Sequence, residues 1–183
     1  MLSREHIFYS FSQYLKILGG ILLPAEPMHS QAYITSLDYS STAAYLPGVG
    51  LSFVIAYVIK EKGWIRRLLF ISVMISLFPI LNSIYTGFSQ DYRRWWYMPV
   101  LIMALTSAIV LDHYEDYKIR ISVIINFSLV FAFAAVITYY IKRGKFALFS
   151  KEMFIGLVVV ALGSCIVIWI LSWSSRMFRI GIW

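Results

Sequence analysis

The sequence predicts an all-α, polytopic membrane protein, with about five transmembrane helices preceded by an interfacial amphipathic helix. Of the 183 residues, 60% are hydrophobic and only 14% are charged, whereas a typical soluble domain carries about 25% charged residues. So few charges cannot cover a water-facing surface, but apolar side chains can face lipid without cost. Aromatic residues make up 17% of the chain, and Trp and Tyr gather at membrane interfaces. We therefore expect a multi-pass protein of the cell membrane.

The net charge of +7 does not predict a nucleic-acid partner. The basic residues occur in short runs between apolar segments, not on one face of a soluble domain. Anionic lipid headgroups are the expected counter-charge, so membrane lipids are expected partners. Cys165 stands alone in a hydrophobic run, which predicts neither a disulfide framework nor a Cys-based metal site. We expect no metal and no cofactor.

Residues 1–42 are predicted to form the interfacial helix and an outer surface loop. Apolar residues recur at helical spacing over residues 5–23, with polar residues between them. Such a stripe favours a helix that lies in the interface plane. Pro24 and Pro27 end it, and the polar stretch to about Thr42 is interpreted as an ordered loop at the membrane surface.

Residues 43–183 are predicted to form a transmembrane helical bundle. Its spans are expected at about 43–59, 68–85, 95–111, 121–141 and 153–172. The last two contain no charged residue, and helices of about 20 residues cross a hydrocarbon core of about 30 Å. The first three are shorter and require tilt or local thinning of the bilayer. Pro47 interrupts the first near its start, and Pro79 interrupts the second near its end.

The distribution of charge leaves the orientation open. The basic run 60–67 is predicted to be cytoplasmic by the positive-inside rule. Alternation then places 60–67, 112–120 and the tail from Trp173 inside, and 1–42, 91–94 and 142–152 outside. Each side would hold eight Lys and Arg residues, so charge alone does not decide the orientation of the chain in the membrane.

The candidate ligand site lies between the second and third spans, where two arginines stand among aromatic residues. Arg binds phosphate oxygens through paired N–H donors, and Trp and Tyr can stack on a sugar or pack on an isoprenoid tail. This pattern predicts a site for a lipid-linked phosphate, although ordinary interface anchors have the same composition. Its candidate residues are Asn82, Asp91, Tyr92, Arg93, Arg94, Trp95 and Trp96.

Two of these residues have alternative interpretations. Asp91 is the only carboxylate of the run, and pairing with Arg93 or Arg94 is favoured over a role as general base. Asn82 is a polar amide within a span, so it is expected to face the bundle interior, for helix packing or for a ligand. No residue is assigned a catalytic role.

Four short motifs follow one another over residues 20–115. They are the helix entry Tyr45-Leu46-Pro47-Gly48, the basic turn 60–67, the segment from Pro79 to Phe88, and the step Tyr92-Arg93-Arg94-Trp95. With these motifs the chain resembles the bacterial YfhO family of membrane proteins, which have a GT-C-type glycosyltransferase architecture. The resemblance implies sugar transfer from a polyprenyl-phosphate donor to a cell-envelope polymer, on the outer face. It also implies that the Arg93–Trp95 region faces outward.

The chain departs from that family at its start. The family pattern places a catalytic carboxylate in a first outer loop, after a first transmembrane helix, and no such segment precedes residue 20. We therefore expect a fragment from the C-terminal part of such an enzyme, with the missing N-terminal part or a larger chain as partner. A non-catalytic assembly subunit and a transporter or flippase of a lipid-linked solute remain the alternatives; the last would use inverted repeats.

Overall fold

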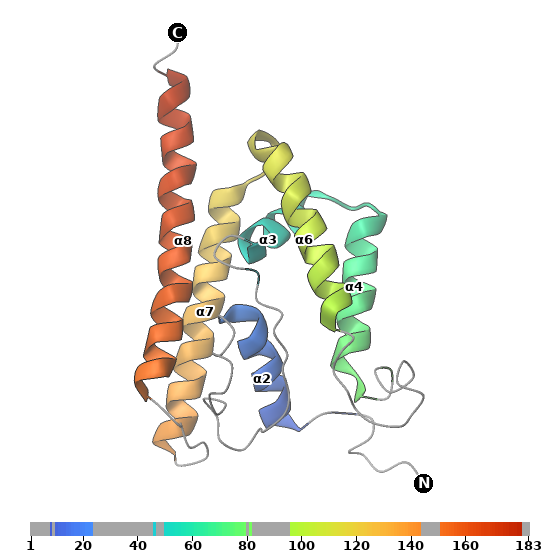
Figure 1. The fold of residues 1–183 in the computed structure, drawn as a ribbon, viewed down its shortest axis with the longest axis vertical. Helices are drawn as coiled ribbons and strands as arrows, with labels where there is room; N and C mark the ends of the chain where they lie inside the picture. The colour runs from blue at the N-terminus through green and yellow to red at the C-terminus, as the bar shows by residue number, and fades with distance from the viewer. Residues whose placement is uncertain are drawn as a thin grey trace.

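The protein is all-α over the part of the chain that its computed structural model describes. This part comprises residues 10–23, 50–79, 96–143 and 151–180, with Phe8, Leu46 and Leu81; of residues 12, 16, 151–153 and 171–180 it describes the backbone alone. Six α-helices form it (Figure 1), namely α2 (Phe11–Leu22), α3 (Gly50–Lys60), α4 (Trp64–Leu77), α6 (Tyr97–Asp112), α7 (Ile119–Lys142) and α8 (Lys151–Ile180). A 3-10 turn, η2 (Tyr114–Asp116), joins α6 to α7.

Helices occupy all five regions in which spans are expected, with shifted ends. α4 begins at Trp64 and ends at Leu77, and Phe78 is extended, with φ −108° and ψ 118°. The residue before a proline is disfavoured in the helical conformation, so Pro79 ends this helix earlier than the expected span. α8 continues past the expected end to Ile180. The predicted domain boundary near residue 42 lies outside the described residues.

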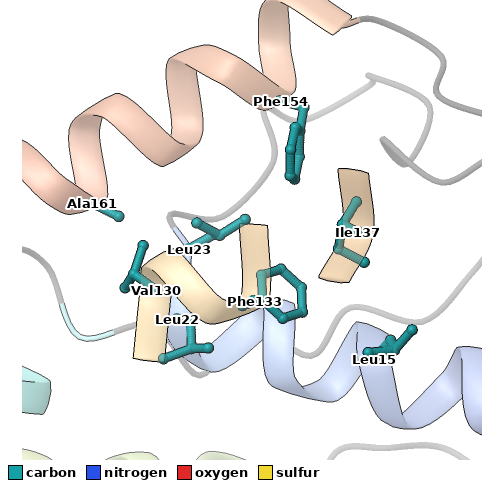
Figure 2. Packing of buried hydrophobic residues seen from close by; sticks show 8 residues of the cluster. All are labelled: Leu15, Leu22, Leu23, Val130, Phe133, Ile137, Phe154 and Ala161. Atoms are coloured by element: carbon teal, nitrogen blue, oxygen red, sulfur yellow. The ribbon is translucent and has the colours of Figure 1, made fainter. Parts of the chain in front are cut away.

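Helix α2 confirms the helix expected within residues 5–23. The backbone N–H of Ser10 donates to Oε1 of Gln13 over 3.1 Å, which caps its first turn. Its apolar residues pack against α7 and α8, in a cluster formed by Leu15, Leu22, Leu23, Val130, Phe133, Ile137, Phe154 and Ala161. Figure 2 shows Leu22 and Leu23 beside Val130 and Phe133. Leu15 and Leu22 of the stripe therefore face other helices, whereas Phe8, Phe11 and Leu18 are exposed. The interfacial position of α2 stays a prediction.

Helix α3 is the central helix of the bundle. Residues on several of its sides are buried, among them Ser52, Phe53 and Val54. One side packs with α6, α7 and α8 around Phe53 and Tyr57. The other packs with α4 and α6 around Val54. A helix that is apolar on most sides is buried within a bundle, and α3 follows that rule.

The ends of α4 and α6 lie at two opposite ends of the bundle (Figure 1). At one, which we call the Tyr117 end, Lys60 and Glu61 at the end of α3 contact Asp116 and Tyr117. At the other, the Trp96 end, Trp96 packs with Leu77 and with Ile17 of α2. Ring contacts also join the start of α2 to the end of α4 (Phe8–Phe78, 5.7 Å) and to the end of α7 (Phe11–Tyr140, 5.5 Å).

The bundle exposes large apolar side chains and buries small polar ones. Exposed apolar residues line the outward faces of α4, α6, α7 and α8, among them Phe70, Ile71, Leu101, Leu105, Ile124, Phe131, Val159 and Val167. In the described ranges the buried polar residues are Ser52, Ser72, Ser76, Thr106, Ser107, Ser122 and Asn126. The interior is mainly apolar around these few polar groups, and large apolar side chains are also exposed on the outside, which is unusual for a water-soluble domain.

Five spans were expected, but among the described residues only α7 is both long enough and apolar enough to cross a membrane. It has 24 residues and a mean hydropathy of 2.4, and a third of its apolar window, 33%, is buried. Gly50–Lys60, Tyr97–Asp112 and the Phe154–Ile170 part of α8 are apolar but shorter.

Candidate functional site

Of the seven predicted ligand residues, the structure places one. Asn82, Asp91, Tyr92, Arg93, Arg94 and Trp95 lie outside the described residues. Trp96 is described, and it immediately precedes α6. The predicted ligand run is thus joined to the described bundle at the Trp96 end.

Trp96 packs into the protein and is not an exposed anchor. Its side chain is only 4% exposed, and it packs with Ile17 at the centre of a cluster that also contains Tyr14, Ile21, Leu77 and Val100. The interface-anchor interpretation therefore does not fit Trp96, whereas the next residue, Tyr97, is exposed as such an anchor would be. Pro99 is tolerated in the first turn of α6 because an N–H there would have no helical acceptor.

The indole N–H of Trp96 is buried, and it has no hydrogen-bond acceptor within the described ranges. A buried donor without an acceptor costs about 1–3 kcal/mol. The neighbouring polar contact is made by Tyr14, whose hydroxyl donates to the carbonyl of Leu77 over 3.1 Å. That bond ties α2 to the end of α4 and so fixes the surroundings of Trp96.

A second polar group lies inside the bundle. Nδ2 of Asn126 donates to Oγ of Ser52 over 3.0 Å and approaches Sγ of Cys165 at 3.5 Å. These residues come from α7, α3 and α8. Asn126 is 5% exposed, and its Oδ1 has no donor among the residues described. The available signal was one amide near the middle of a long and mainly apolar segment.

The other buried hydroxyls bond to carbonyls of their own helices. Ser72, Ser76 and Thr106 each bond a carbonyl three or four residues earlier, which satisfies them without a partner helix. Ser107 does the same with Met103 over 2.8 Å, and it also reaches the carbonyl of Gly50 in α3 at 3.2 Å. Among the described hydroxyls, Ser52 and Ser107 thus link α3 to its neighbours.

The Tyr117 end carries a compact set of charged contacts. Nζ of Lys60 lies 3.9 Å from Asp116 and 4.4 Å from the ring centre of Tyr117. The Tyr117 hydroxyl donates to Oε1 of Glu61 over 3.4 Å. Burial, and then the charge of Glu61, raise the pKa of Tyr117 above its ordinary value. These contacts hold the α3–α4 turn against η2. In the described part of the chain no three His, Cys, Asp or Glu side chains are grouped to hold a metal ion.

No protein-family model, curated protein or solved structure matches this chain.

Proposed function

We propose that this chain is a polytopic integral membrane protein, and that it forms part of a glycosyltransferase that uses a polyprenyl-phosphate-linked sugar. The carrying observation is the large apolar surface that the bundle exposes. Large apolar side chains cover the outward faces of four helices, while Asn126, Ser52 and Ser107 lie inside. Lipid is the solvent in which that arrangement is stable, because interhelical hydrogen bonds are protected from water and apolar faces need no cover.

The exposure of α7 supports the same proposal. A soluble core helix of this apolarity would be mostly buried, but only 33% of the apolar window of α7 is buried. Exposed apolar patches larger than a few hundred square ångströms are rare on soluble monomers. The shorter α3 and α6 complete the bundle, with tilt or thinning adjusting the bilayer to their length.

The glycosyltransferase part of the proposal rests on the resemblance to the YfhO family and on the arginine run. Arg93 and Arg94 are proposed to bind the donor phosphate on the outer face, and Tyr92 and Trp95 to pack on the sugar or the polyprenyl chain. Trp96 supports this because its packing against Ile17 anchors the start of α6, to which the run is joined. Its indole N–H, which has no acceptor among the residues that the structure describes, is a further donor at this end of the bundle.

The first experiment tests which side of the membrane carries the arginines. Cys165 is the single cysteine, so a Cys165→Ser background allows labelling of one introduced cysteine with a membrane-impermeant maleimide on intact cells. Arg93→Cys is expected to be labelled without permeabilisation. Lys62→Cys, at the opposite end, is the matched control and should be labelled only after permeabilisation. Labelling of Arg93→Cys only after permeabilisation would contradict an outward donor site.

The second experiment measures transfer. Membranes that contain the chain with its expected partner segment are supplied with a radiolabelled polyprenyl-phosphate sugar. A charge-assisted hydrogen bond contributes about 1.5–3 kcal/mol, so Arg93→Ala or Arg94→Ala should lower transfer by roughly ten- to a hundred-fold. Arg143→Ala, an exposed arginine at the same end, should leave transfer unchanged. An equal loss of transfer in all three variants would contradict the assignment of Arg93 and Arg94 to the donor phosphate.

A non-catalytic assembly subunit is the second candidate, and the outward face of α8 favours it. Ile155, Val159 and Val167 are exposed along it, and a Cβ added to Gly156 or Gly163 would meet no described atom within 4 Å. Such a face can receive another helix. This candidate predicts no sugar transfer in any preparation, together with stoichiometric co-purification of a larger membrane chain.

A further inference from the structure

The outward face of α4 is a continuous exposed stripe. The side of the helix marked by Trp64 continues three, four, seven and ten residues further on, a helical spacing that places on one side the residues Trp64, Arg67, Leu68, Ile71 and Met74. All five are exposed, Trp64 at 69%. The opposite side of the helix carries the buried residues Leu69, Ser72 and Ser76, and Leu69 packs with Val54, Ile102 and Met103 of α3 and α6.

The stripe changes character along its length. At the Tyr117 end it is basic and aromatic, with Lys62 and Arg67 beside Trp64; from Leu68 to Met74 it is wholly apolar. From Trp64 to Met74 the helix rises about 15 Å, which is half of a hydrocarbon core of about 30 Å. The apolar part alone, from Leu68 to Met74, rises about 9 Å, which fits within one leaflet, and the basic part then lies where headgroups would be.

The positive charge of this segment is not neutralised within the described residues. Glu61 accepts from Tyr117, and Asp116 pairs with Lys60, whereas no ion pair in the described part involves Lys62 or Arg67. Arg66 donates to the Glu61 carbonyl over 3.3 Å and stacks on Phe70 at 5.5 Å, so its charge also stays uncompensated. The first turn of α4 contains no acidic residue, although a helix N-terminus favours negative charge.

We infer that the outward face of α4 binds an anionic phospholipid, with its phosphate against Lys62 and Arg67 and its acyl chain along Leu68, Ile71 and Met74. Trp64 lies at the level of the glycerol backbone, where its amphipathic ring is most stable. The inference rests on the membrane insertion proposed above, and it adds a lipid site at the end opposite to the proposed donor site. Charge complementarity selects the anionic headgroup over a zwitterionic one.

The test uses the full chain reconstituted in nanodiscs of phosphatidylcholine that contain a minor fraction of phosphatidylglycerol. In one arm phosphatidylglycerol carries a photoreactive acyl chain, and in the other phosphatidylcholine carries it. Crosslinked peptides are quantified by mass spectrometry. In the wild-type chain, residues 68–74 should be labelled more strongly by phosphatidylglycerol than by phosphatidylcholine.

Each basic residue near a membrane surface contributes about 1 kcal/mol of attraction to anionic lipid. Lys62→Gln or Arg67→Gln should therefore reduce the preference for phosphatidylglycerol about fivefold, and the double variant about thirtyfold. Both side chains are exposed, so both variants should fold. Lys142→Gln/Arg143→Gln removes the same charge at the Trp96 end and should leave labelling of residues 68–74 unchanged.

Three outcomes would overturn the inference. They are an unchanged preference in the Lys62→Gln/Arg67→Gln variant, an equal loss in the Lys142→Gln/Arg143→Gln control, and displacement of the lipid by inorganic phosphate, which would assign the site to a free anion. Failure of the proposed membrane insertion is distinguishable, because α7 would then be labelled by neither lipid. With insertion intact, α7 is labelled in every variant.

Discussion

Asn126 of α7 donates a hydrogen bond of 3.0 Å to Ser52 of α3, across 74 residues of sequence and inside the bundle. Cys165 of α8 is the third member of this contact, at 3.5 Å. The three helices meet at one polar point that is surrounded by apolar residues such as Phe53, Val123 and Ile168. A single polar contact in such surroundings fixes the rotation and the register of each helix, because any other arrangement leaves the amide unpaired.

The Asn126–Ser52 bond should couple the two residues energetically. Interhelical hydrogen bonds in membrane proteins contribute about 0.6 kcal/mol on average and about 1.7 kcal/mol at most. Asn126→Leu and Ser52→Ala, made singly and together, should give a coupling energy within that range in a double-mutant cycle of unfolding in detergent. Ser128→Ala paired with Ser52→Ala is the control, since Ser128 is exposed and bonds its own helix. Additive effects for Asn126 and Ser52 would show that the bond does not stabilise the bundle.

Trp96 should matter through its size more than through its N–H. Trp96→Ala removes a buried ring from the contact with Ile17 and should destabilise the protein by about 3–5 kcal/mol. Trp96→Phe retains most of the ring and deletes a donor that has no described acceptor, so stability should change by less than about 1.5 kcal/mol. Thermal unfolding followed by circular dichroism compares the two. A Trp96→Phe variant as unstable as Trp96→Ala would mean that the N–H makes an essential bond.

Tyr117 should respond to alkaline pH with a defined sign. Its folded pKa is raised by burial and by the negative charge of Glu61, so folding favours the protonated phenol. The resulting stabilisation is complete below the ordinary Tyr value of about 10, and it is lost as the pH rises through the higher folded pKa. Tyr117→Phe should flatten the fall in stability at alkaline pH, measured by unfolding at several pH values. A profile unchanged from that of the wild type would exclude Tyr117 as its source.

Phe131 tests whether lipid covers the outward face of α7. It is 64% exposed near the middle of the helix, and on a soluble protein Phe131→Arg would change stability by less than about 0.5 kcal/mol. At the centre of a membrane span an arginine costs about 2.5–3.5 kcal/mol of insertion free energy. We therefore expect Phe131→Arg to reduce the membrane-inserted fraction strongly in a glycosylation-mapping assay. Leu111→Arg, exposed beside the Tyr117 end, should insert normally, and equal insertion of both would argue against the membrane proposal.

The positions of the helices could be predicted from the sequence because helix formation is local. Apolar runs predicted helices in all five regions, and Pro79 predicted an irregular end to the second because a proline constrains the residue before it. The ends were less predictable. α4 stops at Leu77, short of the expected end of its span, and α8 continues to Ile180. Most of the predicted ligand site, residues 91–95 with Asn82, lies outside the described residues and stays a prediction.

The sequence by itself determined the helical class, the apolar composition that calls for lipid, and the regions where helices form, since backbone hydrogen bonds within a helix join residues only four apart. Only the tertiary structure decided which faces meet. It placed Leu15 and Leu22 of α2 against α7 and α8, buried Trp96 although an exposed interface anchor was one of the two expectations, and paired Asn126 with Ser52. Such contacts join residues far apart in the chain. They depend on the packing of whole helices, which no local spacing of residues encodes.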